Sequence, residues 1–178
     1  MVTNVLRAST STGPETGLVE SLAALSRTLV GITTRALATL DVDVTLSQYR
    51  AIVVLASRGP LRTVDLAAAL HVHPSTATRT CDRLVRRGLV ARHPGATDRR
   101  VSWLALTTSG KELVGEVMRR RTDQIRELVG SRRTESARDL AELVEALVVA
   151  AGEPTERQWW QQWERCTGPS LTPSEHTG

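Results

Sequence analysis

Several features that mark other classes of protein are scarce or missing in this sequence. Its 178 residues include only two cysteines, Cys81 and Cys166, too few for the disulfide framework typical of small secreted domains. No apolar run approaches the roughly 18 residues that a membrane span requires. The N-terminal segment also lacks the basic start and apolar core of a signal peptide. We therefore expect a cytoplasmic protein that does not associate with a membrane.

The motifs of catalysis are missing as well. The sequence has no glycine-rich phosphate loop, no Gly-x-Ser-x-Gly and no pair of carboxylates with an attendant histidine. His71, His73 and Cys81 are the candidates for metal ligands, but no Cys-x-x-Cys or His-x-x-x-His spacing supports a tetrahedral site. We expect neither an enzyme nor a bound metal or cofactor.

The remaining composition is that of a folded chain with a small positive charge. Hydrophobic residues make up 40% and charged residues 24%, whereas disordered chains combine low hydrophobicity with high net charge. The length suits one domain or two small ones that share a core. A formal charge of +4 suggests only an acidic partner, so the position of the charge matters more than its size.

Apolar periodicity predicts helices at both ends of the chain. Residues 1–16 show no apolar period and are expected to form a loose arm. A narrow seam then repeats at intervals of three and four residues: Leu18, Leu22, Leu25, Leu29, Ile32 and Ala36. Two further helices follow Thr108 and Thr134, and the second ends at Gly152. Narrow seams suit packing between the helices of two subunits, so a dimer bundle is predicted, with a closed monomeric core as the alternative.

The middle of the chain is predicted to hold three shorter helices. A capping box at residues 45–48 starts the first, which Gly59 ends. Thr63 is expected to cap a second helix that runs to Leu70. Pro74 suits the first position of a third helix, which ends at Gly88. The short connection between the last two helices predicts a helix-turn-helix.

A hairpin is predicted directly after this unit. Residues 89–92 and 101–106 have strand-like composition, and the segment between them is rich in turn formers and ends in two arginines. We interpret the pair as a β-wing with a basic tip.

The excess positive charge is concentrated on the third helix and the wing. Residues 79–100 hold seven arginines against Asp82 and Asp98, a net charge of +5, while the rest of the chain carries −1. Arg79, Arg83 and Arg86 or Arg87 recur at helical spacing, which is typical of a helix that enters a DNA groove. The alternative for such a run is a solvated helix face. The two aspartates are better placed to orient neighbouring arginines than to contact DNA.

These residues resemble those of the MarR family of winged helix-turn-helix transcription regulators. The matching stretches are Asp65-Leu66-Ala67, Ser75 to Arg79, Asp82-Arg83-Leu84, Gly88-Leu89-Val90, Arg92, Asp98-Arg99-Arg100, Leu104, Leu106-Thr107 and Gly110. The resemblance in motif covers about Thr45 to Leu113, and the flanking helices agree in placement and length.

The resemblance implies a homodimer on double-stranded DNA, with interlocking terminal helices and a recognition helix of each subunit in the major groove. The residues that would face the major groove are Ser75, Thr76, Thr78, Arg79 and Arg83. Arg99 and Arg100 would enter the minor groove from the wing, with Asp82 and Asp98 as wing support. His73 departs from the family pattern, in which serine often precedes this proline. Because histidine is a poorer helix cap, we assign His73 to a phosphate contact instead.

The resemblance also implies regulation by a small molecule or an oxidant. Family members typically bind small aromatic or lipophilic effectors between the dimer bundle and the winged unit, but no residue pattern identifies that site here. Arg27, Arg35 and Tyr49 are its candidates, although ordinary surface or interface positions suit each of them better. Cys81 is a possible redox site because nearby arginines would lower its pKa; the alternative is a small buried core residue.

Three of the four tryptophans form a separate feature near the C-terminus. Residues 155–158 fit a capping box, and Trp159, Trp160 and Trp163 then share one helix face. This face is expected to pack on the chain's own dimer core, with an external partner as the alternative.

The predicted fold is mainly α with a small β-wing, a winged helix-turn-helix joined to a helical dimerisation bundle. Its parts are a loose arm (1–16), an N-terminal dimerisation helix (17–44), a DNA-binding domain (45–107), C-terminal dimerisation helices (108–152) and a tryptophan-rich helix with a frayed tail (153–178). The predicted function is a cytoplasmic, nucleoid-associated repressor that an effector releases from a pseudo-palindromic operator. The alternatives are an architectural DNA-binding protein of weak sequence preference, a cysteine-based redox regulator, and an interaction protein that works through its tryptophan helix.

Overall fold

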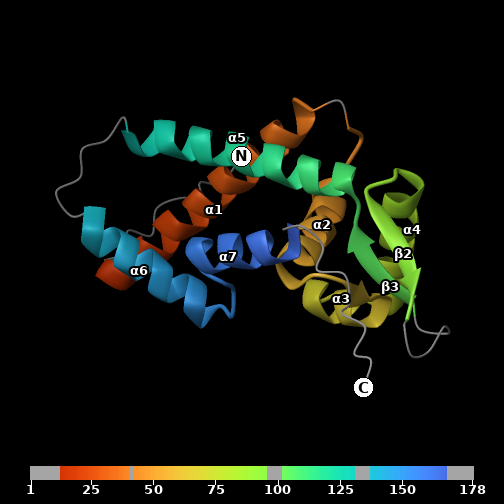
Figure 1. Cartoon of the computed structure of the whole chain (residues 1–178). Helices are drawn as coiled ribbons and strands as arrows, with labels where there is room; N and C mark the ends of the chain where they lie inside the picture. Colours follow the sequence, from red (N-terminus) through yellow and green to blue (C-terminus); the bar gives the residue numbers. More distant parts are fainter. Residues whose placement is uncertain (1–12, 41, 96–101, 131–136, 168–178) are drawn as a thin grey trace, which may run out of the picture.

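The computed structural model describes residues 13–40, 42–95, 102–130 and 137–167. Within these ranges the elements are α1 (Pro14–Ala38), α2 (Leu46–Arg58), β1 (Leu61–Arg62), α3 (Thr63–Leu70), α4 (Pro74–Arg86), β2 (Val90–Pro94), β3 (Ser102–Leu106), α5 (Thr108–Gly130), α6 (Ala137–Ala150) and α7 (Glu156–Thr167). Figure 1 shows the long helices at one side and the small sheet with α3 and α4 at the other. The predicted fold class, mainly helical with a small wing, is confirmed.

The central element is α2, and its start follows the predicted capping box. The Gln48 backbone N–H donates to Thr45 Oγ1 at 3.3 Å, and the Thr45 N–H donates to Gln48 Oε1 at 3.2 Å. Gly59, with φ of 75°, ends the helix. One face of α2 is fully buried, including Ile52 and Leu55. This face joins the terminal helices to the winged unit in one hydrophobic core.

The sheet contains one strand that the sequence pattern does not reveal. The strand order is β1-β3-β2, and both pairings are antiparallel. β1 consists of Leu61 and Arg62 alone, opposite Leu104 and Trp103 of β3. Two residues are too few to show the period-two alternation by which strands are identified in a sequence. Its pairing with β3 attaches the start of α3 to the wing.

The predicted cap of α3 is wrong. Arg62, with extended backbone angles, holds the N-cap position without a side-chain cap bond, and Thr63 is the first helical residue. The reason is that pairing with β3 keeps the chain extended through Arg62, so the helix begins at the next residue. Arg62 instead pairs with Asp65 at 2.7 Å, and this bond lowers the pKa of the Asp65 carboxyl.

The terminal helices leave much of their apolar surface uncovered. In α1, Ile32 and Ala36 are buried, whereas Leu18 is 39% exposed and Leu25 is 43% exposed. α6 has no buried residue. Four apolar side chains at intervals of three, one and three residues form an exposed stripe along it: Leu140, Leu143, Val144 and Leu147. Within the described ranges no helix is long and apolar enough to cross a membrane.

The first helix begins earlier than predicted, because α1 starts at Pro14 rather than beyond Thr16. Proline at the first helical position and Glu15 in the first turn are both favourable at a helix start. These signals precede the apolar seam, so a prediction based on periodicity placed the helix start too late.

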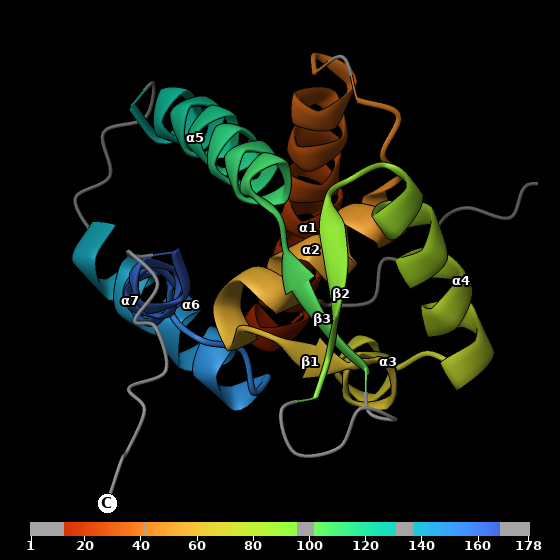
Figure 2. The same ribbon diagram turned by 45° about the vertical axis from the view of Figure 1, so that its right-hand side comes forward.

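The tryptophan helix packs on its own chain. Its predicted capping box is present, with the Gln158 N–H donating to Thr155 Oγ1 at 3.3 Å and the Thr155 N–H donating to Gln158 Oε1 at 2.9 Å. Trp159 is 7% exposed, and its ring stacks on Trp163 with centroids 5.6 Å apart. α7 lies against α2, so the tryptophan face joins the hydrophobic core. Figure 2 shows α7 and α6 on the side of α2 away from α4.

Candidate nucleic-acid interface

Helices α3 and α4 form the predicted helix-turn-helix. His71, in the left-handed conformation with φ of 54°, ends α3, and Pro74 occupies the first turn of α4 as predicted. Ala77, Cys81 and Leu84 form the buried face of α4. The opposite face of α4 is exposed to solvent. Because the two helices pack against each other through apolar side chains, the exposed face is held in a fixed orientation.

His73 caps α4, contrary to the expectation that it is too poor a cap for this position. Its Nδ1 accepts the Ser75 backbone N–H at 3.3 Å and lies 2.9 Å from Ser75 Oγ. Histidine Nδ1 is bonded to Cγ, as is the side-chain oxygen of asparagine, which is a favoured N-cap residue. When Nδ1 carries a free lone pair, it can therefore accept the same hydrogen bond as the asparagine oxygen. The ring as a whole remains exposed beside the start of the helix.

The predicted DNA-facing residues of α4 lie together on its exposed face. Ser75 and Thr76 occupy the first turn, and the Thr78 hydroxyl donates to the Pro74 carbonyl at 2.9 Å. Arg79 and Arg83 follow at an interval of four residues and are exposed, as is Arg86. Among the described residues none of these three arginines has an ion-pair partner. The structure therefore presents a row of exposed guanidinium groups beside short hydroxyl side chains.

Two other arginines of the basic segment have structural partners. Arg87, the C-cap of α4, places its guanidinium 2.5 Å from both Asp43 Oδ2 and Gln48 Oε1. The third member of the exposed row is thus Arg86 and not Arg87. The sequence gives little sign of this contact, because Arg87 and Asp43 are 44 residues apart. It fixes the end of α4 to the start of α2.

Asp82 connects α4 to the wing. Its Oδ1 lies 2.5 Å from the Arg92 guanidinium, and Arg92 belongs to β2. This ion pair agrees with the prediction that Asp82 orients a neighbouring arginine. The wing tip itself, with Asp98, Arg99 and Arg100, lies outside the described residues. β2 and β3 are paired up to Pro94 and Ser102, and Figure 2 shows the two strands side by side between α2 and α4.

Cys81 is a core residue in this structure. Its side chain is 1% exposed, and burial raises the pKa of its thiol. The positive charge of Arg92 acts in the opposite direction, but its effect is smaller and the negative charge of Asp82 opposes it. The expected lowering of the pKa by arginines is therefore outweighed, which favours the alternative of a buried structural cysteine.

We expect Cys81 to be inert toward thiol reagents in the folded protein. In a Cys166→Ser variant, its reaction with Ellman's reagent should be on the order of a hundred-fold slower than in the same protein unfolded in guanidinium chloride, because attack requires local opening. Equal rates in the two states would show that Cys81 is accessible, and would restore the redox alternative.

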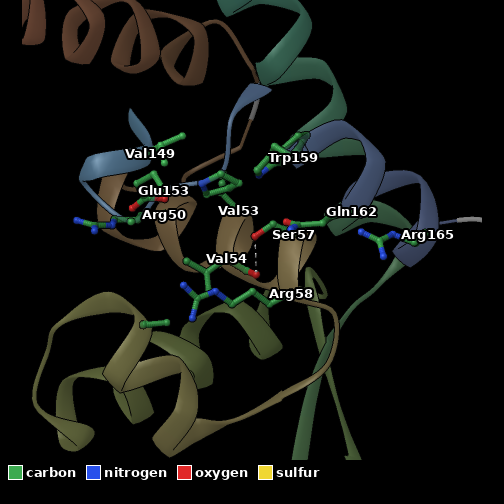
Figure 3. Close-up of a pocket in the computed structure, with 13 residues that line it drawn as sticks. Arg50, Val53, Val54, Ser57, Arg58, Val149, Glu153, Trp159, Gln162 and Arg165 are labelled. Atoms are coloured by element: carbon green, nitrogen blue, oxygen red, sulfur yellow. Dashed lines mark hydrogen bonds between the residues drawn. The ribbon is translucent and has the colours of Figure 1, made fainter. Parts of the chain in front are cut away.

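The candidate effector residues do not form a site. Arg27 and Arg35 are exposed on α1, whereas Tyr49 is buried in α2, which raises its pKa to about 12. A large hollow lies elsewhere, between α2 and the corner that joins α6 to α7 (Figure 3). None of these three residues lines it. In the part of the chain that the structure describes, no cluster of side chains could hold a metal ion.

Comparison with known proteins agrees with the geometry of this interface. The family model "MarR family" matches residues 44–102. The HTH-type transcriptional regulator FarR of Neisseria gonorrhoeae is 34% identical over 101 residues, which cover 55% of this chain and 69% of that protein. The HTH-type transcriptional repressor MdtR of Bacillus subtilis is 36% identical over 75 residues, covering 42% of this chain and 48% of that protein.

A solved structure extends the similarity to the whole fold. The crystal structure of RV1404 from Mycobacterium tuberculosis superposes with a TM-score of 0.74 at 33% identity, covering 81% of this chain and 98% of that one. The shared region thus includes terminal helices beyond the winged unit. The chain belongs to the MarR family and is a DNA-binding transcriptional regulator of the winged helix-turn-helix type, not an enzyme.

Proposed function

We propose that the chain is a homodimeric repressor that reads a pseudo-palindromic operator and leaves it when a small aromatic or lipophilic effector binds. The observation that carries this proposal is the exposed row of arginines on the second helix of a helix-turn-helix, which have no ion-pair partner among the described residues. A repressor of this kind acts in the cytoplasm at the nucleoid, where its operator lies.

The row on α4 suits the major groove of DNA. Arg79 and Arg83 can each donate two hydrogen bonds to a guanine edge or contact phosphates. The hydroxyl groups near the start of α4, on Ser75, Thr76 and Thr78, can reach nearby bases or phosphates. The exposed ring of His73 can reach a phosphate. Arg99 and Arg100 are assigned to the flanking minor groove, with Asp98 as support for the wing.

The apolar surface of α1 and α6 supports a dimer. An exposed stripe of four large apolar side chains on one helix is unfavourable in water, and burial of apolar surface contributes roughly 25 cal/mol per Å². Stripes at helical intervals fit the interlocking of helices from two subunits. Two copies related by a two-fold axis would present two recognition helices to two half-sites.

Effector release follows from a population shift in such a dimer. In one arrangement of the dimer the two recognition helices match the spacing of the half-sites, and in another they do not. A ligand that binds more tightly to the second arrangement lowers the fraction of protein able to bind the operator. The effector is therefore expected to lower the affinity of the dimer for the operator. It makes no covalent change to the protein or to the DNA.

Selection of bound fragments from random DNA at fixed salt tests the proposal directly. We expect an inverted repeat whose half-sites lie about one helical turn apart. Uniform recovery of unrelated sequences, with a steep salt dependence, would instead identify an architectural DNA-binding protein.

With the selected operator, Arg79→Ala and Arg83→Ala should each weaken binding by roughly ten- to a hundred-fold, the usual effect of a lost base contact. Thermal stability should not change, because both side chains are exposed and make no ion pair with another described residue. Arg157→Ala, which removes an exposed arginine from α7, is the matched control and should bind as the unchanged protein does. If all three variants bind alike in a mobility-shift titration, α4 is not the reading helix.

A further inference from the structure

Helix α6 carries the apolar stripe assigned to the subunit interface, yet it has little packing on its own chain. None of its residues is buried. The extensive helix packings of the described chain involve α1, α2, α5 and α7, but not α6. The position of α6 therefore depends on the segments at its two ends. Residues 131–136 lie outside the described ranges, whereas residues 151–155, which lead to α7, lie within them.

The corner between α6 and α7 is closed by backbone hydrogen bonds. The Gly152 N–H donates to the Val149 carbonyl at 2.9 Å, and the Glu153 N–H donates to the Val148 carbonyl at 3.2 Å. Together with the φ of 75° at Gly152, these bonds form a Schellman motif, which ends a helix in a defined turn. Pro154, whose ring fixes φ, comes next, and the capping box of α7 follows directly. Because these constraints are consecutive, the direction of α7 determines that of α6.

Three tryptophans attach α7 to α2. Trp159 belongs to the hydrophobic core, stacks on Trp163, and meets Trp160 edge-on with centroids 5.1 Å apart. Burial raises the pKa of Tyr49 in α2 to about 12, and the charge of Glu156 in the first turn of α7 adds to this rise, so that turn lies close to α2. Each indole can bury roughly 150–250 Å². The contact between α7 and α2 is therefore a firm one.

The helix to which α7 is attached also supports the DNA-binding unit. α3 packs on both α2 and α4, and α4 contacts α2 as well. Figure 2 shows α4 and α7 on different sides of α2. A continuous series of contacts thus leads from the stripe of α6 through the corner, α7 and α2 to the recognition helix.

We propose that residues 151–167 form a strap that fixes α6 to α2, and that the strap restricts the distance between the two recognition helices of a dimer. Trp159 is its main positioning residue and acts through α2 without touching DNA. Affinity for one half-site depends on α4, whereas the choice between half-site spacings depends on how each α4 is held relative to the subunit interface. The inference rests on the proposed function, because it requires a dimer with α6 in its interface.

An insertion in the corner tests the strap without removing either of its ends. A Gly-Ser-Gly-Ser insertion between Glu153 and Pro154 keeps both the Schellman motif and the capping box, and the same insertion after Thr167 is the matched control. Binding is measured on duplexes with one half-site, with two at the selected spacing, and with two at a longer spacing. The corner insertion should reduce the preference for the selected spacing about ten-fold, a typical size for coupling between sites. Affinity for one half-site should not change.

Variants of Trp159 test the attachment of α7 to α2. Trp159→Ala should reduce the spacing preference as the corner insertion does, and Trp159→Phe, which keeps a flat apolar ring, should restore most of it. Gln161→Ala, at an exposed position of α7, should bind as the parent does. Circular dichroism checks that each variant is folded. If Trp159→Ala is not folded, the corner insertion decides the matter.

The outcomes distinguish a failure of the strap from a failure of the proposed function. A parent protein that is a monomer by light scattering, or that shows no preference between spacings, contradicts the dimeric operator-binding protein itself. A dimeric parent with a clear preference that the corner insertion leaves intact overturns the strap alone. An equal loss of affinity on all three duplexes also overturns it, because the corner would then support the fold and not the spacing.

Discussion

The double variant Leu143→Glu/Leu147→Glu is expected to be a monomer of 19.4 kDa in solution and to bind the operator at least roughly a hundred-fold more weakly than the parent protein. Both leucines lie on the apolar stripe of α6, 40% and 41% exposed in the single chain. If a partner subunit covers this stripe, each glutamate buries a charge without a counterion, which costs several kcal/mol. The loss of DNA binding follows because two linked recognition helices bind two half-sites far more tightly than one helix binds one.

The mass of the variant in solution, measured by light scattering, checks this result. Val149→Glu is the control, because it makes the same chemical change on the opposite face of the same helix and should leave the parent's oligomeric state intact. Circular dichroism should show that the double variant keeps its helix content, since the replaced side chains are not part of the chain's own core. A dimer that persists in the double variant would place the subunit interface elsewhere.

Gly110→Ala is expected to lower the free energy of unfolding by about 3 kcal/mol, equivalent to a fall in Tm of about 6–12 °C. A Cβ at this position would lie 2.1 Å from the Leu89 carbonyl oxygen and 3.1 Å from its carbonyl carbon. Both atoms are backbone, so a side-chain rotation cannot relieve the overlap. The surroundings are also fixed: Gly110 N–H donates to Thr107 Oγ1, and that hydroxyl donates to the Gly88 carbonyl at 2.6 Å.

Gly115→Ala is the matched control on the same helix. Its added Cβ would have no heavy atom within 4 Å, so the change should stabilise the protein by about 0.5–1 kcal/mol through helix propensity alone. Thermal unfolding of the two variants should therefore shift in opposite directions. A Gly110→Ala variant as stable as the parent would mean that the start of α5 is not clamped against the chain segment between α4 and β2.

Local signals made most of the elements predictable. The capping boxes before α2 and α7, the proline that starts α4 and the glycines that follow α2 and α4 all act within a few residues, and the structure has each of them. The exposed row of arginines was predictable for the same reason, because its spacing on one helix needs no knowledge of the rest of the fold.

What the sequence did not reveal depends on distant residues. β1 exists only because β3 pairs with it, and this pairing moved the cap of α3 to Arg62. The docking of Arg87 on Asp43 and the hollow around Trp159 both require that separate helices be placed against each other. The pKa of the Cys81 thiol depends on two opposing effects, nearby arginines and burial. The arginines are visible in the sequence, but the burial that outweighs them is not.

The double contact of Arg87 determines which parts of the protein move together. Arg87 joins the last turn of α4 to Asp43 and to Gln48, whose side-chain oxygen also closes the capping box of α2. These two contacts hold the end of α4 against the start of α2, so a tilt of α4 alone would have to break them. α2 in turn packs on α1, α5 and α7, so a movement of α4 that is passed on through this contact would reach helices from both ends of the chain. If the chain acts as a dimer, the separation of its two α4 helices, and with it the spacing of half-sites that the dimer tolerates, would depend on a contact at the opposite end of α4 from Ser75 and Thr76.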